Sequence, residues 1–237
     1  MRFSGKVALV AGGTGGLGRA VSLLFLNEGA TVIATYVVDQ EFAALTSAAG
    51  ANGSALGGRK VDVTDEAAVA RLIDGIVAEH GRLDVLVNTV GGYAGGTKLW
   101  EVDTKIFDRM LTLNLSSGFV LARAASKVMV KQQAGAIVNI AAKAAIDHPA
   151  GLSAYSASKA AALALIDSLA ADLKGTGVRV NSVLPSIIDT EANRTAMPTA
   201  NFASWPKPED IARVVAFLCS DDAKVVQGAA IPVYGSA

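Results

Sequence analysis

A tyrosine and a lysine four residues apart, Tyr155 and Lys159, carry the most informative chemistry in this 237-residue chain. They stand in the segment SAYSASK (153–159), which we expect to be helical, so both side chains would lie on one face within reach of a shared ligand. A free phenol has a pKa of about 10, and a neighbouring ammonium favours the phenolate and lowers that value. We therefore expect Tyr155 to be a general acid whose pKa is lowered by Lys159. The spacing alone also fits a solvated helix face, so the pair gains meaning only from its surroundings.

A glycine-rich segment near the N-terminus could bind phosphate groups. The residues GGTGGLG (12–18) separate a short apolar run (7–11) from a segment whose apolar residues have helical spacing (19–28). Glycines let the chain turn sharply and let a pyrophosphate approach the backbone, while the following helix attracts the anion through its N–H groups and dipole. A tight turn without a ligand explains the cluster less well, because the segment follows a strand in an alternating chain. The expected dinucleotide contacts here are Gly12, Thr14, Gly15, Gly16, Leu17 and Gly18.

The end of the second strand should contact the adenosine ribose of such a cofactor. An acid about 20 residues beyond the glycines would hold the 2′-hydroxyl and repel a 2′-phosphate. Here Tyr36 occupies the end of the strand, Asp39 lies a little beyond it, and no arginine follows. The cofactor is therefore NADP or NAD, and the missing repelling charge slightly favours NADP.

Two further segments could complete the adenosine site. Asp62 and Val63 could bracket the adenine ring, and Asn88, Val90 and Gly91 would lie beside the ribose. Either segment could instead be an ordinary turn between a strand and a helix.

The elements that must position these residues alternate along the chain. Short apolar strands are expected at 7–11, 31–38, 59–63, 83–87, 136–140, 178–184 and 229–234. Helices are expected at 19–28, 40–49, 66–80, 104–133, 153–174 and 209–220. Strands of this kind between helices predict a parallel sheet covered on both faces, and thus a doubly wound, Rossmann-like α/β fold of about seven strands. Residues 1–237 would form a single domain, with a substrate loop at about 185–208.

Composition excludes several other classes. An apolar fraction of 51% with 18% charged residues is inconsistent with a disordered regulator. Because 21 basic residues balance 21 acidic ones, we expect no nucleic-acid or membrane partner. One cysteine, Cys219, and two histidines make neither an internal disulfide nor a metal site. We expect a cytoplasmic protein that acts on a small molecule.

Over essentially its whole length the chain resembles the short-chain dehydrogenase/reductase family. The similar motifs are Gly12-x-x-x-Gly16-x-Gly18, NTVG (88–91), Asn114, Tyr155-x-x-x-Lys159, PSIIDT (185–190) and VQG (226–228). The resemblance implies hydride transfer to or from a nicotinamide, with Tyr155 as proton donor and Lys159 on the cofactor ribose. It also implies that Asn114 helps to hold a relay water. Pro185, Ile188 and Thr190 would then contact the nicotinamide carboxamide and the nearby phosphate.

One member of the family pattern is missing. The family has a serine thirteen residues before the tyrosine, and this chain has Ala142. Losing one hydrogen-bond donor to a developing oxyanion typically costs ~10²–10³ in rate. Ordinary ketone or alcohol chemistry would then need Lys143 or a water in place of the hydroxyl.

Three segments are similar to the dihydropteridine reductase branch, which also lacks that serine. They are GGYAGG (91–96), AKAAID (142–147) and the substrate loop at 189–205. A quinonoid dihydropterin takes hydride into a conjugated ring system, so no localised alkoxide needs a serine hydroxyl. The resemblance predicts an electron-poor heterocycle as substrate, with Tyr93 or Trp205 stacking on it. Ala142 and His148 would border the same pocket, although Trp205 could equally anchor the loop and His148 could simply be exposed.

Two other functions remain open. The chain could be an ordinary carbonyl reductase acting on a 3-oxoacyl or sugar-like substrate, or a catalytically silent dinucleotide sensor. Retention of Tyr155, Lys159 and Asn114 argues against the sensor, because binding alone needs no proton donor. The apolar helices at 104–133 and 153–174 would form the interface of a homodimer or homotetramer.

Overall fold

Seven parallel strands form one sheet in this computed structural model, which describes residues 1–236. The strands are β1 (Val7–Ala11), β2 (Thr31–Tyr36), β3 (Leu56–Lys60), β4 (Val85–Asn88), β5 (Gly135–Ile140), β6 (Val178–Pro185) and β7 (Ala230–Val233). Their order is β3-β2-β1-β4-β5-β6-β7, so the chain reverses its direction of travel between β1 and β4. Ligands of doubly wound sheets bind at such a switch point, at the carboxyl ends of the strands. The expected Rossmann-like fold is confirmed.

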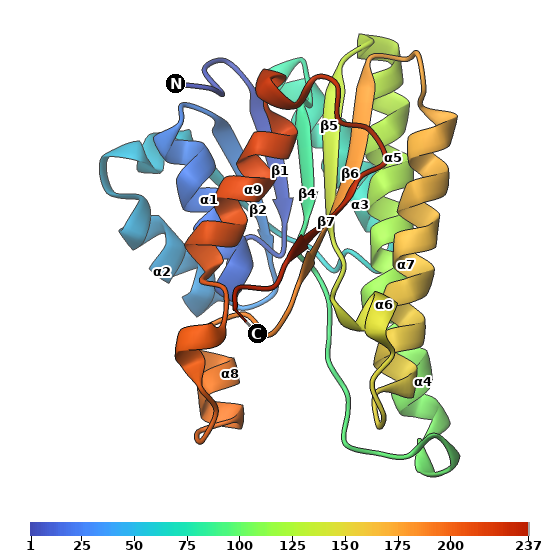
Figure 1. Cartoon of the computed structure of the whole chain (residues 1–237). Helices are drawn as coiled ribbons and strands as arrows, with labels where there is room; N and C mark the ends of the chain where they lie inside the picture. The colour runs from blue at the N-terminus through green and yellow to red at the C-terminus, as the bar shows by residue number, and fades with distance from the viewer. Residues whose placement is uncertain (237) are drawn as a thin grey trace.

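Helices cover both faces of the sheet (Figure 1). On one face lie α1 (Gly16–Asn27), α2 (Asp39–Ala49) and α9 (Pro208–Cys219), and on the other α3 (Glu66–His80), α5 (Ser117–Gln132) and α7 (Ser153–Asp172). The shorter helices α4 (Thr104–Leu111), α6 (Ala144–Asp147) and α8 (Glu191–Ala196) project beyond the carboxyl ends of the strands. They form the rim around the switch point.

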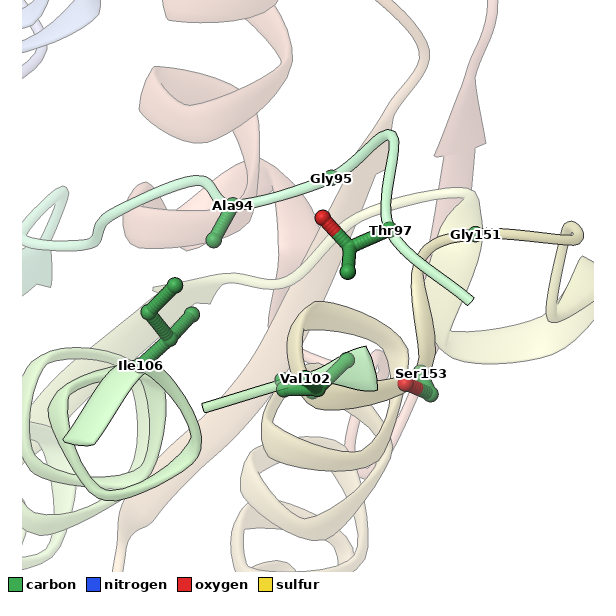
Figure 2. Close-up of a pocket in the computed structure, with 8 residues that line it drawn as sticks. Ala94, Gly95, Thr97, Val102, Ile106, Gly151 and Ser153 are labelled. Atoms are coloured by element: carbon green, nitrogen blue, oxygen red, sulfur yellow. The ribbon is translucent and has the colours of Figure 1, made fainter. Parts of the chain in front are cut away.

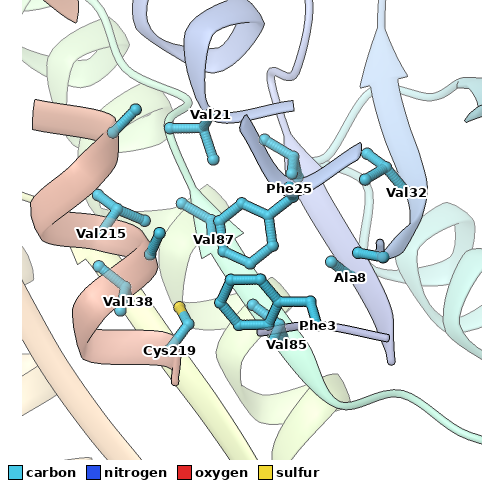
Figure 3. Packing of buried hydrophobic residues seen from close by; sticks show 14 of the residues in the cluster. Phe3, Ala8, Val21, Phe25, Val32, Val85, Val87, Val138, Val215 and Cys219 are labelled. Atoms are coloured by element: carbon cyan, nitrogen blue, oxygen red, sulfur yellow. The ribbon is translucent and has the colours of Figure 1, made fainter. Parts of the chain in front are cut away.

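Each face of the sheet has its own hydrophobic core. Under α1 and α9, the rings of Phe3 and Phe25 stack with centroids 4.4 Å apart, and Cys219 packs beside them (Figure 3). Under α3, α5 and α7, residues such as Leu121 and Met129 are fully buried. Because both faces are covered, β1 is buried at every position, as its continuous apolar sequence predicts.

Two expected elements differ from the structure. The third strand was expected at 59–63, but β3 begins at Leu56 and ends at Lys60, leaving Asp62 and Val63 in the turn that follows. Gly58 lies in this strand because a Cβ there would collide with the ring of Phe42. The long helix expected at 104–133 is interrupted by a π-helical turn, Thr112–Ser116, between α4 and α5.

The expected helix ends of α3 are confirmed. The Asp65 side chain accepts a hydrogen bond from the Ala68 N–H at 3.0 Å, and Gly81 closes the helix in the left-handed region with φ of 73°. None of the helices among residues 1–236 has the length and apolar character needed to span a bilayer.

Candidate functional site

The glycine segment forms a tight loop between β1 and α1. Gly12 has φ of 71°, a conformation that side chains with a Cβ rarely adopt. A Cβ at Gly18 would collide with the Gly12 carbonyl oxygen, and one at Gly16 would lie 2.7 Å from the Thr190 methyl. The N-terminus of α1 has no side-chain cap and no acid in its first turn, so its N–H groups are available to an anion. The loop therefore fits the pyrophosphate of a dinucleotide.

Side chains of neighbouring strands and helices hold this loop. The Gly12 N–H donates to Thr35 Oγ1 at 2.9 Å, and the Gly13 N–H donates to the Thr35 carbonyl oxygen at 3.1 Å. Ser22 Oγ donates to the Gly13 carbonyl oxygen at 3.0 Å, and Thr89 Oγ1 donates to the Gly12 carbonyl oxygen. Sequence reasoning did not identify Thr35 or Ser22 as supports, although a polar residue on a buried strand was a usable signal.

The expected adenosine contacts gather at the carboxyl ends of β2 and β3. Tyr36 stacks on Phe42 of α2, with ring centroids 4.7 Å apart and planes 8° apart. Asp62 accepts hydrogen bonds from the Thr64 N–H and hydroxyl, and these two bonds hold the pKa of its carboxyl below the ordinary value. Val63 is buried beside it. A role for these residues in binding adenine remains a prediction.

The segment after β4 lies against Lys159. Asn88 uses its amide inside the protein, donating to Asn139 Oδ1 at 3.0 Å and accepting from the Val90 N–H at 3.1 Å. A Cβ on Gly91 would lie 3.1 Å from Lys159 Nζ. Because Gly91 has no side chain, the backbone of this segment passes close to the ammonium.

Tyr155 and Lys159 lie in α7, as the sequence predicted, but their pKa values are set mainly by burial. Lys159 is buried and donates to the Ile140 carbonyl oxygen at 2.9 Å, and burial lowers its pKa to about 8. Burial, with a smaller contribution from Tyr93, raises the pKa of Tyr155 to about 12. The expectation that Lys159 lowers the phenol pKa is therefore wrong for the protein without cofactor, because loss of hydration and the neighbouring Tyr93 both raise this pKa. At neutral pH the phenol keeps its proton.

Asn114 ties α7 to the loop after β4. It lies in the π-helical turn, and its amide pairs with both backbone groups of Gly92, accepting from the N–H at 2.9 Å and donating to the carbonyl at 3.0 Å. The same amide donates to Ser158 Oγ at 2.9 Å, and Ser158 Oγ donates to the Tyr155 carbonyl oxygen at 2.7 Å. Sequence reasoning missed Ser158, a buried hydroxyl one residue before the lysine. The relay water expected beside Asn114 remains a prediction.

The position of the missing serine carries no hydroxyl. Ala142 is buried. The Lys143 ammonium is engaged elsewhere, with its Nζ 3.8 Å from an Asp147 carboxylate oxygen and 5.0 Å from the centre of the Tyr234 ring. These contacts hold the ammonium next to the end of β7.

The four expected substrate contacts fall into two groups. Tyr93 is 69% exposed and meets the Tyr155 ring edge-on, with centroids 5.1 Å apart, so it borders the reacting phenol. His148 is exposed on the neighbouring rim, as the alternative reading allowed. Trp205 is only 7% exposed and packs against Phe202 with ring centroids 5.0 Å apart. This burial supports the alternative role of Trp205 as an anchor of the loop rather than the expected stacking on substrate.

The loop at 185–208 is ordered around α8. Thr190 caps this helix by accepting from the Asn193 N–H at 3.2 Å, and Asn193 Nδ2 donates to the Ile188 carbonyl oxygen at 2.8 Å. Arg194 pairs through two nitrogens with Asp189, at 2.5 and 2.8 Å, and thereby lowers the pKa of that carboxyl. Since the Thr190 methyl faces Gly16, this loop lies beside the glycine loop. Contacts of Ile188 and Thr190 with a cofactor remain a prediction. Pro185 ends β6 and accepts from the Lys143 N–H.

A small cavity of about 40 Å³ lies between the loop after β4 and the starts of α4 and α7 (Figure 2). It is lined by Ala94, Gly95, Thr97, Val102, Ile106, Gly151, Ser153 and Ala154. Neither Tyr155 nor Lys159 lines this cavity, so it is separate from the catalytic pair. Within residues 1–236 no group of three or more metal-ligating side chains comes together.

Comparison with known proteins finds relatives that are similar over nearly the whole length of this chain. The sequence profile of the short chain dehydrogenases matches residues 6–201. A 3-oxoacyl-[acyl-carrier-protein] reductase of Thermotoga maritima is 32% identical, over 99% of this chain and 98% of its own length. The D-threitol dehydrogenase of Mycolicibacterium smegmatis is 35% identical, over 99% of this chain and 93% of its own.

Two solved structures with bound cofactors have the same fold. The structure of ElxO with NADP bound has a TM-score of 0.92 and 28% identity, covering 97% of each chain. A xylitol dehydrogenase with bound NAD⁺ has a TM-score of 0.90 and 27% identity, covering 99% of this chain and all of the other.

Proposed function

The chain belongs to the short-chain dehydrogenase/reductase family, and on that premise we propose that it reduces a carbonyl compound, with Tyr155 as the proton donor. It is an oxidoreductase that uses NAD or NADP. When bound, the nicotinamide supplies or takes up the hydride. The chain's own residues hold the cofactor, orient the substrate and move the proton.

The observation that carries the proposal is a phenol and a buried ammonium on one helix, α7, which Asn114 ties to the loop after β4. With a pKa of about 12, Tyr155 holds its proton at neutral pH and can give it to a substrate oxygen during reduction. Lys159, with a pKa of about 8, still carries a charge at neutral pH and can stabilise the phenolate left behind. Asn114 and Ser158 fix the helix that presents both groups. A dinucleotide sensor would not need this arrangement.

The relatives favour ordinary short-chain chemistry over pteridine chemistry. One of them is a 3-oxoacyl-[acyl-carrier-protein] reductase and another is a D-threitol dehydrogenase. We propose a substrate of this kind, with a carbonyl group flanked by polar or acyl substituents. Closeness to dihydropteridine reductases has no support among these relatives.

One observation keeps a second candidate. The exposed Tyr93 ring meets the Tyr155 ring edge-on, and Ala142 offers no hydrogen-bond donor for a localised alkoxide. An exposed aromatic ring next to the phenol suits an electron-poor heterocycle such as a quinonoid dihydropteridine, in which the negative charge is delocalised.

A substrate panel separates the two candidates. Purified enzyme is assayed with a 3-oxoacyl thioester, with D-threitol and xylitol, and with quinonoid dihydropterin, each with both cofactors. The main proposal expects turnover of a carbonyl or alcohol substrate that is lost in Tyr155→Phe. Turnover of the dihydropterin alone would favour the heterocycle as substrate. Turnover that does not depend on Tyr155 would contradict both candidate functions.

We also propose that the chain forms a homodimer or homotetramer through α5 and α7. Phe119 and Val130 of α5 are 41% and 39% exposed in the single chain. Light scattering of the wild type and of Phe119→Glu tests this proposal: a monomeric wild type at micromolar concentration would contradict it.

A further inference from the structure

The first turn of α2 places an acid against the glycine loop. Thr14 Oγ1, in the middle of the loop, donates to Glu41 Oε2 at 2.8 Å. Thr14 is buried and Glu41 is exposed, so the carboxylate lies at the surface of the loop with solvent beside it. The sequence spacing gave no sign of this contact, because it joins residues 27 apart.

The position of Glu41 is fixed by packing. The stacking of Phe42 on Tyr36 holds the start of α2 to the end of β2. Gly58 of β3 leaves the room that the Phe42 ring occupies. The carboxylate next to Phe42 therefore has a defined place relative to the loop.

The other charges at this edge do not neutralise Glu41. Lys60, at the end of β3, is paired in register with Tyr36, and its Nζ lies 2.6 Å from an Asp39 carboxylate oxygen. Asp62 is the remaining acid. Arg59 is engaged with Glu79 of α3. Among the described groups at the ends of β2 and β3 and the start of α2, the two cations, Lys60 and Arg59, are therefore both paired with acids other than Glu41.

We propose that Glu41 makes this enzyme prefer NAD(H) over NADP(H), by repelling the cofactor's 2′-phosphate. The inference rests on the proposed function, because it requires a dinucleotide on the glycine loop. In Rossmann folds the adenosine ribose lies between that loop and the end of β2, which is the space that Glu41 borders. An acid there accepts a hydrogen bond from the 2′-hydroxyl of NAD and repels a phosphate in its place. This acid comes from α2 and not from the end of β2. The expected cofactor preference therefore changes from NADP, which the end of β2 alone slightly favours, to NAD.

The direct test is cofactor affinity, measured without substrate. Isothermal titration with NADH and NADPH should give a Kd for NADPH that is higher by at least about tenfold, as expected for like charges a few ångströms apart in a partly hydrated site. Glu41→Gln should lower the ratio of the Kd for NADPH to the Kd for NADH, mainly because NADPH binds more tightly. Glu209→Gln, which removes an exposed acid from the first turn of α9, is the matched control and should leave the ratio unchanged.

Two further variants sharpen the result. Lys60→Gln removes the cation that balances Asp39 and should widen the ratio. Arg19→Gln tests the exposed arginine that follows the loop and should have little effect. Raising the salt concentration should reduce the discrimination of the wild type, since exposed charges are screened.

The possible failures are distinguishable. If the wild type binds NADPH as tightly as NADH or more tightly, or if Glu41→Gln leaves the ratio unchanged, the role of Glu41 is contradicted while the proposed function survives. If neither dinucleotide binds, the proposed function fails as well. Circular dichroism of each variant confirms that the affinities refer to folded protein.

Discussion

The two sides of the cleft are built by different means. On the cofactor side, polar atoms pair with one another: Thr35 holds the glycine loop, and Asn114 holds the segment that passes Lys159. On the proposed substrate side, Tyr93 and Ile146 expose apolar surface, at 69% and 52%, and the buried Ala142 brings only a methyl group.

This contrast indicates where specificity can vary. Hydrogen bonds with defined geometry leave few alternatives for the loop and the catalytic helix, so that half suits a ligand of constant shape. Exposed side chains on a rim make few directional bonds and can change without disturbing the sheet. The cofactor half therefore identifies the enzyme class, and the rim identifies the substrate.

The largest effect is expected from removing the proton donor. Tyr155→Phe should lower kcat by roughly 10²–10⁴, the usual contribution of a positioned general acid. Cofactor affinity should stay within a few-fold of the wild type, because the ring is retained. Tyr93→Phe, the matched loss of a hydroxyl on the other side of the aromatic pair, should keep most of the activity. Equal losses in the two variants would contradict the distinct roles of the two tyrosines.

The next effect concerns the methyl group on the substrate side. Ala142→Ser should raise kcat/KM for simple ketones by about 10–100-fold if a developing oxyanion lies there, since a donor of this kind is typically worth 10²–10³. Ala144→Ser, also at a buried alanine, controls for added polarity. No gain with any carbonyl substrate would mean that no alkoxide forms next to Ala142 and would favour the heterocycle.

The buried ammonium should be costly to the folded protein. The folded pKa of Lys159 is about 8 and the unfolded value is 10.5, so the unfolded chain holds the proton more readily between these values. Stability attributable to this group is therefore lowest below pH 8 and recovers as pH rises towards 10.5. Lys159→Met should stabilise the protein at pH 7 by about 2 kcal/mol, after allowing for the bond to Ile140 that it loses.

The measurement is chemical denaturation of both proteins from pH 7 to pH 10. The gain in free energy of unfolding of Lys159→Met over the wild type should shrink as the pH rises, and the variant should lose activity. A variant that is less stable at pH 7, or a difference that does not depend on pH, would show that burial does not depress this pKa.

The smallest effect is expected in the loop above the cofactor. Arg194→Gln removes the two-nitrogen pair with Asp189 and should raise the KM of the cofactor about two- to fivefold with little change in kcat, as expected for an exposed pair. Arg213→Gln, which breaks the exposed pair with Asp210, is the control. A large fall in kcat would instead assign this loop a part in the chemistry.

The sequence predicted most of the fold and the catalytic pair, because both depend on local patterns. Strand and helix periodicity, the glycine loop and the spacing of Tyr155 and Lys159 can be read within short windows. The position of β3 could not be predicted in this way, because Gly57 and Gly58 have low strand propensity. Gly57 lies against Ile33 of β2 and Gly58 against the ring of Phe42, and these contacts join segments far apart along the chain. The π-helical turn at Asn114 was hidden for a similar reason, because helical periodicity continues on both sides of it.

The properties that the sequence missed depend on tertiary environment. The phenol pKa follows from burial, and the pattern Tyr-x-x-x-Lys suggested the opposite direction. The burial of Trp205 and the contact of Glu41 with Thr14 join segments whose distance along the chain carries no signal. Such features need coordinates.

The most direct test of the central claim is the titration of the Tyr155 phenol itself. Tyrosine labelled with ¹³C at Cζ can be followed by NMR, with the Tyr155→Phe variant identifying the resonance. In the enzyme without cofactor, the account predicts that this signal remains that of a protonated phenol up to pH 10, because its pKa is about 12. Titration near neutral pH would show that burial does not set the pKa of this phenol and would contradict the account of the site.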